Sequence, residues 1–221
     1  MTRAALFDVD GTLVDTNHLH VTAWWEAFRQ AGHRVRMHDL HRSVGLSGDD
    51  LIARLLGEER DRDADAGISA AHKTLYAQYF ERLPPFDAAG DLLRALAGRG
   101  WRVVLATSAG GSELAALRRA IGADDVIAGA ASADDVAAGK PAPDPVQRAV
   151  ELADVPPGRA VFVGDTVWDM RAAGRAGVTP VGVLCGGIPQ ESLRAAGARA
   201  LFSDPADVLR QLESSPFGAT G

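Results

Sequence analysis

A pair of carboxylates stands at the end of the first apolar run of this sequence. Asp8 and Asp10 follow residues 4–7, and residues two apart in an extended strand point to the same side, so both carboxylates can emerge together. Carboxyl ends of strands are where α/β sheets bind ligands. Gly11 then lets the chain turn away without a side chain in the pocket. Taken alone, Asp-Val-Asp-Gly also fits an ordinary turn.

A second pair of acids follows another apolar run. Asp165 and Asp169 come after residues 160–163. If a helix starts near Thr166, the two carboxylates stand about one turn apart on the same side of it. The alternative is that Asp165 only caps this helix, where its charge favours the helix dipole.

Two more positions suit the binding of a phosphate group. Thr107 ends the run that begins at Trp101, and its hydroxyl, with the backbone N–H of Ser108 beside it, can meet a phosphate oxygen. Lys140 lies in the Pro-rich segment Gly-Lys-Pro-Ala-Pro-Asp. A plain strand-end threonine and a solvated surface lysine are the alternative interpretations.

These residues form a set because the carboxyl ends of parallel strands converge along one edge of a sheet. Gathering Asp8, Asp10, Asp165 and Asp169 there is unfavourable without compensation, since each close carboxylate pair costs roughly 3 kcal/mol at ~5 Å and an effective dielectric of ~20. A divalent cation compensates that charge. Ligands that are all oxygen point to Mg²⁺, which takes one or two carboxylates plus substrate phosphate.

The elements that must position these residues alternate along most of the chain. Nearly continuous apolar runs predict strands buried on both faces of a parallel sheet, and they span Ala4–Asp8, Trp101–Thr107, Ala160–Asp165 and Pro180–Leu184. Helix-length segments lie at Asp87–Arg99, Ser112–Ile121, Pro145–Ala153 and Trp168–Ala176. The alternation predicts an α/β fold with helices on both sides of the sheet.

One stretch breaks the alternation and is typical of an inserted helical cap. It contains three predicted helices and no convincing strand, the helices being His18–Ala31, Asp49–Leu56 and Ala66–Arg82. Pro84-Pro85 cannot continue a helix and, with Asp15-Thr16, marks a hinge. We expect an α/β core in residues 1–15 and 84–213, the cap in residues 16–83, and a frayed tail in residues 214–221.

Composition narrows the class of partner. A formal net charge of −6 over 221 residues, without a dense Lys/Arg block, argues against nucleic acid. The single cysteine, Cys185, excludes an intrachain disulfide and favours a reducing compartment. The N-terminus lacks the apolar stretch of a secretory signal, and no run is long enough to span a membrane. We expect a cytoplasmic monomer or homodimer.

Together the motifs resemble those of the haloacid dehalogenase superfamily, in its phosphatase branch with a helical cap inserted after the first strand. The resemblance covers nearly the whole chain, with motifs from Asp8 to Asp169 and the cap at residues 16–83. It implies a Rossmann-like, three-layer core built on a parallel sheet. It also implies a Mg²⁺-dependent phosphatase whose substrate is a small-molecule phosphate ester.

The resemblance assigns roles to the motif residues. It implies that Asp8 attacks phosphorus, and that Asp10 protonates the leaving alcohol and then serves as base for the hydrolytic water. Thr107 binds the phosphoryl oxygens, and Lys140 steadies the charge shared by nucleophile and phosphate. The magnesium ligands that it implies are Asp8, the backbone carbonyl of Asp10, Asp165 and, as an additional acid, Asp169.

The cap is expected to close over the substrate and exclude competing water, which restricts the enzyme to small substrates such as phosphoglycolate or sugar phosphates. Cap position suggests six candidates for recognition of the leaving group, namely His20, Trp24, Leu46, Ser47, Lys73 and Tyr76. The other histidines considered, at positions 18, 33, 38 and 41, lack the paired spacing of zinc motifs.

Other activities of the same superfamily fit less well. A haloacid dehalogenase proper would lack the acid two residues after the nucleophile, so Asp10 argues against it. A phosphonatase would form an imine on a cap lysine, and Lys73, the only lysine of the cap, is explained more simply as part of a helix face. A binding module that has lost catalysis is disfavoured because every motif residue is present.

Sugar-phosphate mutases of the β-phosphoglucomutase type are the closest competitor. In that group an arginine follows the loop that corresponds to residues 45–47 and helps to hold a second phosphate. Gly48 occupies this place, which favours hydrolysis, although Arg42 or Lys73 could compensate. The mutase-like positions of the first cap helix are Thr16, His20 and Trp24.

Overall fold

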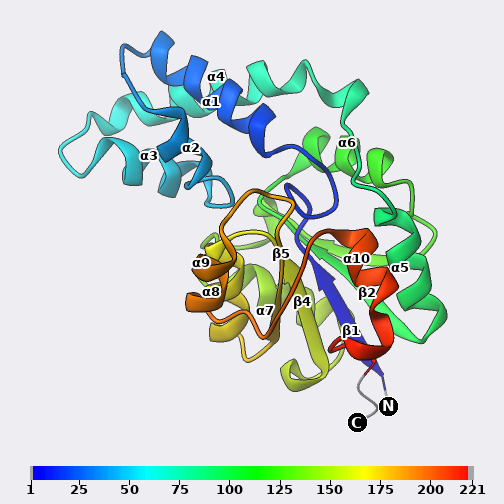
Figure 1. Ribbon diagram of the computed structural model, residues 1–221. Coiled ribbons are helices and arrows are strands. Elements are labelled where there is room, and N and C mark those ends of the chain that lie inside the picture. The colour runs from blue at the N-terminus through cyan, green and yellow to red at the C-terminus, as the bar shows by residue number, and fades with distance from the viewer. Residues whose placement is uncertain (1, 219–221) are drawn as a thin grey trace.

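The computed structural model describes residues 2–218 and is built on one six-stranded parallel sheet (Figure 1). The strands lie in the order β3-β2-β1-β4-β5-β6, which is the Rossmann order. They are β1 (Arg3–Phe7), β2 (Trp101–Ala106), β3 (Ile127–Ala131), β4 (Ala160–Gly164), β5 (Thr179–Val183) and β6 (Ala200–Phe202). The predicted α/β fold is confirmed.

Helices cover both faces of the sheet because the central strands are apolar on both sides. On β1, Ala5 and Phe7 face one apolar cluster, whereas Ala4 and Leu6 face another. The first cluster includes residues of α5 (Ala89–Gly98), α6 (Gly111–Ile121) and α10 (Pro205–Arg210), and the second includes residues of α7 (Asp144–Ala153) and α8 (Val167–Arg175). The result is three layers, with the sheet between the helices.

Four helices stand apart from these layers, beyond the carboxyl end of β1 (Figure 1). They are α1 (Asn17–Gln30), α2 (Met37–His41), α3 (Gly48–Leu56) and α4 (Asp65–Ala77). They enclose an apolar cluster of their own, which includes Trp24, Phe28 and Leu51 and is joined by Trp168 of α8. An inserted helical segment with its own core is therefore present, while the exact domain boundaries stay a prediction.

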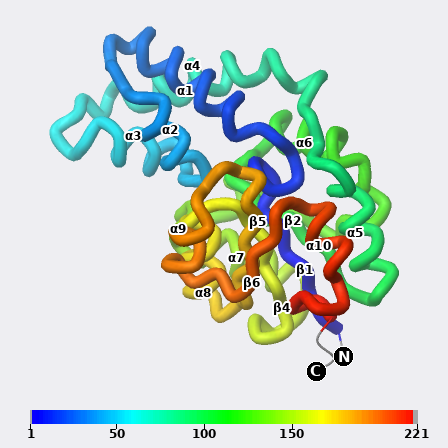
Figure 2. The backbone as a smooth tube through the Cα atoms, in the orientation of Figure 1, coloured from blue at the N-terminus to red at the C-terminus, as the bar shows by residue number. Residues whose placement is uncertain are grey.

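The chain leaves the sheet layers for this helical segment and returns at the same place. Val14 and Pro85 form an antiparallel bridge. The backbone N–H of Asp15 donates to the carbonyl of Pro84 at 2.8 Å, and that of Phe86 donates to Leu13 at 3.0 Å. The two connecting segments, traced as a tube in Figure 2, are thus hydrogen-bonded to each other.

The elements that the sequence did not predict are short. β3 and β6 occupy the two edges of the sheet, and β3 has one Ile followed only by Ala and Gly, which lack the β-branched and aromatic character of most strand residues. The helices α2, α9 (Gln190–Ala195) and α10 have five or six residues each. The helix predicted to reach Arg82 ends at Ala77, and residues 80–82 form a 3₁₀ turn. Within residues 2–218 no helix is long and apolar enough to cross a bilayer.

The predicted frayed tail is wrong for its described part, residues 214–218. Phe217 is buried, stacks on Phe7 with ring centroids 6.4 Å apart, and meets Trp101 edge to face at 5.1 Å. Ser215 is buried as well. An aromatic side chain that fills the end of a core cluster orders the backbone that carries it. Residues 219–221 lie outside the described residues.

We expect Phe217→Ala to lower the free energy of unfolding by about 3–5 kcal/mol, because it removes a buried aromatic side chain and leaves a cavity. Urea denaturation followed by circular dichroism measures the change. Met37→Ala is the control, since Met37 is 45% exposed and its loss is expected to cost less than about 0.5 kcal/mol. Equal stability of the wild type and Phe217→Ala would contradict the packing described here.

Candidate active site

The predicted site residues gather at the carboxyl ends of the central strands. Asp8 follows β1, Asp165 follows β4 and Thr107 follows β2, and these three strands are neighbours in the sheet. The strand order reverses between β1 and β4, and such a switch point leaves a crevice outside the strand ends where α/β sheets bind ligands. The backbone N–H of Asp8 donates to Val163 at 2.9 Å, so pairing with β4 extends to the acid itself.

Lys140 lies at the centre of the acidic cluster. Its Nζ is 2.5 Å from Oδ1 of Asp8 and 2.7 Å from Oδ1 of Asp169. The side chain is fully buried, so the interpretation as a solvated surface lysine is wrong. Burial alone would lower the pKa of Lys140, but the charges of Asp169 and Asp8 raise it. The ammonium group therefore stays charged and holds both carboxylates in place.

Two polar side chains donate hydrogen bonds to Asp165, and the backbone of two glycines packs against its carboxylate. Its Oδ1 accepts from Thr12 at 3.1 Å and its Oδ2 accepts from Asn17 at 2.8 Å. At Gly11, whose φ is +74°, a Cβ atom would collide with Asn17 and Asp165. At Gly186 a Cβ atom would collide with Asp165. Glycine at both positions allows the backbone to close around this carboxylate.

The acids carry more charge than the protein compensates. One carboxylate oxygen from each of Asp8, Asp165 and Asp169 lies within 4.8 Å of the others, and all three residues are buried. With Lys140 as their cation, two negative charges remain. Burial and the charges of Asp169 and Asp10 raise the pKa of Asp8 to about 7, although Lys140 opposes this shift. Burial and the charges of Asp169 and Asp8 raise the pKa of Asp165 well above its ordinary value.

Hydrogen bonding does not satisfy these acids either. The Thr12 hydroxyl lies 3.2 Å from Asp8 and 3.1 Å from Asp165, but it carries one proton and can donate to only one of them at a time. Next to them, Oδ1 of Asn17 is buried without a hydrogen-bond partner among residues 2–218. Oxygen donors with uncompensated negative charge fit a hard divalent cation such as Mg²⁺.

Asp169 has a structural role that the sequence did not reveal. Helix α8 is capped by Thr166, whose side chain accepts from the backbone N–H of Asp169 at 3.2 Å. Oδ2 of Asp169 in turn accepts from the backbone N–H and the hydroxyl of Thr166 at 3.0 and 2.6 Å. Capping by Asp165, the alternative considered from the sequence, is therefore wrong. Asp169 meets the cluster through Lys140 and does not line the cavity.

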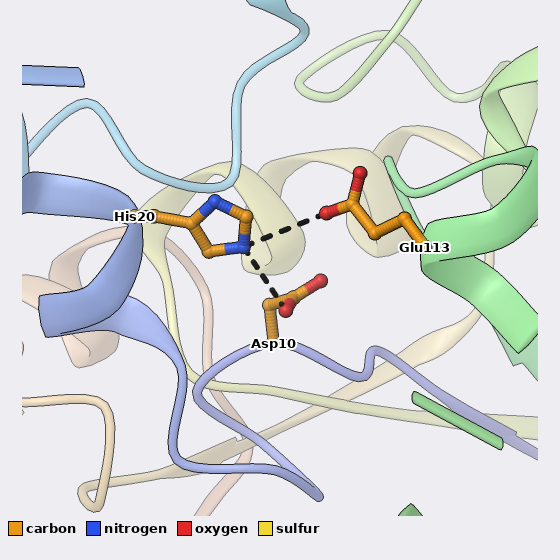
Figure 3. Close-up of side chains that lie close together, drawn as sticks. All are labelled: Asp10, His20 and Glu113. Carbon is orange, nitrogen blue, oxygen red and sulfur yellow. Dashed lines mark hydrogen bonds and ion pairs between the residues drawn. The ribbon is translucent and has the colours of Figure 1, made fainter. Parts of the chain in front are cut away.

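Asp10 turns toward the helical segment (Figure 3). Its Oδ1 accepts from the Thr16 hydroxyl at 2.6 Å and lies 3.2 Å from Nε2 of His20. The same Nε2 is 3.7 Å from Oε1 of Glu113 on α6. Burial opposes ionisation of Asp10, but the charge of His20 and its hydrogen bond lower the pKa of the carboxyl. For His20, burial is outweighed by Asp10 and Glu113, and the imidazole pKa rises.

His20 is supported from behind by a stack of rings. Its Nδ1 is 3.2 Å from Nε2 of His72, and its ring stacks on Tyr76 at 3.9 Å. Trp24 stacks on His72, also at 3.9 Å. Burial and the charge of His20 lower the pKa of His72 to about 2, so His72 is neutral and can accept the Nδ1–H of His20. The stack fixes the imidazole with Nε2 toward Asp10.

A cavity of about 110 Å³ lies between these acids and the helical segment. Four of the six candidates for leaving-group recognition line it, namely His20, Trp24, Leu46 and Lys73. Ser47 does not, because its hydroxyl caps α3 by accepting from the backbone N–H of Asp50. Tyr76 does not, because it is buried beneath His20.

The two phosphate-binding candidates differ in exposure. Thr107 is buried, and its hydroxyl accepts from the backbone N–H of Ala109 at 3.1 Å, which leaves its own proton available. Ser108 lines the cavity, and its hydroxyl is 3.4 Å from the carbonyl of Gly45 in the helical segment. Asp8 and Asp10 line the same cavity as Ser108.

Sequence reasoning assigned no role to four polar residues of the site. Thr12 directly follows the motif that carries Asp8 and Asp10, and a hydroxyl at this position is a signal for a hydrogen-bond partner of these acids. Asn17, His72 and Glu113 carry no local signal, because each reaches the site only through the placement of its helix.

Comparison with known proteins shows which family the chain resembles. A family model described as haloacid dehalogenase-like hydrolase matches residues 2–177. The chain is 32% identical to the protein CbbY of Cereibacter sphaeroides, over 80% of this chain and 82% of the relative. It is 30% identical to a phosphoglycolate phosphatase of Rhodospirillum rubrum, over 92% and 88%. The crystal structure of a hydrolase from Pseudomonas syringae superimposes with a TM-score of 0.91 at 31% identity, over 96% and 98%.

We expect Mg²⁺ to raise the melting temperature of the wild type by roughly 5–10 °C at 100 times its dissociation constant, which corresponds to about 2.7 kcal/mol. Asp165→Asn should melt above the wild type in chelator, because it removes one carboxylate beside Asp8 and Asp169, and it should lose the Mg²⁺ response. Differential scanning fluorimetry measures both effects. The surface variant Asp87→Asn is the control and should behave as the wild type, whereas an unchanged Mg²⁺ response in Asp165→Asn would rule out this ligand set.

Proposed function

The chain belongs to the haloacid dehalogenase-like hydrolase family, and we propose that it is a Mg²⁺-dependent phosphatase that hydrolyses a small phosphorylated metabolite through an aspartyl phosphate on Asp8. The observation that carries the proposal is the 2.5 Å contact of the buried Lys140 with Asp8, which lines the cavity. A buried carboxylate fixed by a buried ammonium group at a switch point is positioned to act on a ligand in the crevice.

Asp8 supplies the nucleophile. An oxygen of its carboxylate attacks phosphorus, the bond to the leaving alcohol breaks, and a covalent aspartyl phosphate remains, which water then hydrolyses. Lys140 neutralises charge shared by Asp8 and the transferring group, and the backbone N–H of Ser108 with the Thr107 hydroxyl would bind phosphoryl oxygens. A metal held by Asp8, Asp165 and the backbone carbonyl of Asp10 would neutralise further phosphoryl charge when bound.

Asp10 supplies the proton transfers. The leaving alkoxide needs a proton in the first step, and the attacking water must lose one in the second. The contact with His20 keeps Asp10 ionised, which suits the second step. For the first step, the raised pKa of His20 makes the imidazolium a store of the proton that Asp10 passes on.

The cavity limits the leaving group to a small one. Its volume of about 110 Å³ is well below the ~300–1,000 Å³ of sites that hold drug-sized ligands. Trp24, Leu46 and Leu51 give it apolar walls, and Lys73 and Ser69 add polar groups. We infer that the substrate is phosphoglycolate or a small sugar phosphate, and the relative from Rhodospirillum rubrum is named a phosphoglycolate phosphatase.

The scarcity of cationic side chains in the cavity favours hydrolysis over mutase chemistry. Gly48 lines the wall where a mutase would place an arginine. Arg42 lines a separate depression on the helical segment, with Arg34, Arg36 and Arg54. Among residues 2–218, Lys73 is the one lysine or arginine in the lining of the cavity, and Glu113 stands there with opposite charge. A second phosphate would thus meet a weakly basic surface.

Asp8→Asn should lower kcat for p-nitrophenyl phosphate at least about 10⁴-fold, because the amide cannot form the covalent intermediate. Release of p-nitrophenol by freshly purified protein, with mass spectrometry to exclude deamidation, measures the loss. Asp87→Asn, an exposed acid outside the site, is the matched control and should keep wild-type turnover. Near-normal turnover of Asp8→Asn would overturn the proposed nucleophile.

Asp10→Asn should separate substrates by leaving group. We expect kcat to fall by roughly 10²–10⁴ with an alkyl phosphate, whose alkoxide needs the proton, and by much less with p-nitrophenyl phosphate, whose leaving group is stable as the anion. Steady-state rates on both substrates give the comparison. Equal losses would argue against a proton donor at this position.

A further inference from the structure

Three potential metal ligands that the proposed magnesium site does not use as a set converge above it (Figure 3). They are a carboxylate oxygen of Asp10, Nε2 of His20 and a carboxylate oxygen of Glu113, and all lie within 4.8 Å of one another. The geometry points to a second metal site here, one that binds Zn²⁺ between the helical segment and the sheet layers and thereby inhibits the enzyme.

The spacing of the ligand atoms suits a small tetrahedral ion. Zn²⁺ binds nitrogen and oxygen at about 2.0–2.2 Å, so neighbouring ligand atoms of a tetrahedral site lie roughly 3.3–3.6 Å apart. His20 Nε2 is 3.2 Å from Asp10 Oδ1 and 3.7 Å from Glu113 Oε1. Two of the three edges therefore lie within about 0.1 Å of this range. The third, of at most 4.8 Å, closes by little more than about 1 Å of movement in the Glu113 side chain.

The surroundings of His20 are those of a metal-binding imidazole. Such histidines hydrogen-bond through their other ring nitrogen, which fixes the ring and its tautomer. Here Nδ1 of His20 lies 3.2 Å from Nε2 of His72, so Nε2 is the atom presented to both carboxylates. The ring is also held by its stacking on Tyr76.

An unsatisfied polar group supports the site independently. The Tyr76 hydroxyl is buried and has no hydrogen-bond partner among residues 2–218. Burial raises the pKa of Tyr76, and the charges of Asp10 and Glu113 raise it further. A ligand at the fourth position of a metal held by those acids would give this hydroxyl an acceptor, and three protein ligands leave that position open.

The donor set distinguishes this site from the magnesium cluster. Mg²⁺ prefers oxygen ligands and near-octahedral geometry, as carboxylates of Asp8 and Asp165 can provide. One imidazole with two carboxylates suits Zn²⁺ and the other late divalent ions, whose affinities for nitrogen donors are higher. Excess Mg²⁺ should therefore saturate one site and leave the other to Zn²⁺.

Inhibition follows from which residues the ion would engage. Asp10 is the proton carrier in the proposed function, on which this part of the inference rests, and a metal on its carboxylate would block both proton transfers. Asp10 and Glu113 belong to the sheet layers and His20 to α1, so the ion would also tie the helical segment in the position seen here. Substrate could then neither enter nor react.

Binding is tested first, without reference to catalysis. Co²⁺ is titrated into the wild type in excess Mg²⁺ and followed by its visible absorption, and Zn²⁺ is titrated by calorimetry. We expect one equivalent of each, and an affinity loss of roughly 10- to 100-fold or more in Glu113→Gln and His20→Gln. His18→Gln is the matched control and should bind as the wild type, because His18 pairs with His41, with rings 5.2 Å apart, and not with the three proposed ligands.

Inhibition is tested second, as the ratio of the rates with and without Zn²⁺ for each variant. Inhibition of the wild type should persist when the Mg²⁺ concentration is raised, and it should weaken at least about tenfold in Glu113→Gln.

Three results would each overturn the inference: equal Zn²⁺ affinity in wild type and Glu113→Gln, loss of binding in His18→Gln, or relief of the inhibition by Mg²⁺. So would one bound equivalent with unaltered turnover. Should Glu113→Gln melt at a lower temperature than the wild type, His20→Gln, which removes the nitrogen ligand, decides the binding test in its place. A chain without phosphatase activity would refute the proposed function while the binding titrations still decided this site.

Discussion

A buried ammonium group between two carboxylates is the interaction on which the rest of this structure depends. Without Lys140, Asp8 and Asp169 would be buried charges with no cation from the protein, a condition that costs several kcal/mol for each unpaired ion. With it, three acids can still share one sheet edge, at the cost of two uncompensated charges. The site is therefore stable enough to fold but keeps a net negative charge. This net charge gives the site affinity for a cation, and with the cation bound, for a phosphoryl group.

Much of the core and of the acidic cluster could be predicted because both follow from local pattern. Runs such as Ala4–Phe7 are apolar on both faces, and in a parallel sheet that property places Asp8 and Asp165 side by side without any knowledge of distances. The edge strands were missed for the opposite reason. Ala200–Phe202 is short and Ile127–Ala131 is rich in small residues, so each becomes a strand only through its neighbour.

The positions that could not be predicted from the sequence are those that depend on packing between residues far apart in the chain. Glu113 lies in the first turn of α6 and His72 lies within α4, yet the two contact His20 from either side. Neither has a spacing that indicates function. For Lys140, the Pro-rich segment that carries it does not indicate that the side chain is fully buried, because this burial also depends on long-range packing. Phe217 was also misjudged, since a Gly- and Pro-rich terminus concealed one aromatic side chain that packs on Phe7.

The bridge between Val14 and Pro85 has an architectural consequence. Because the outgoing and returning segments of the connection are hydrogen-bonded to each other, the chain leaves the sheet layers and re-enters them at one place. The helical segment is in this sense an inserted module. Exchange of such a module between relatives would replace the walls that face the leaving group while preserving the phosphoryl-transfer machinery beneath, a route by which one scaffold acquires new substrates.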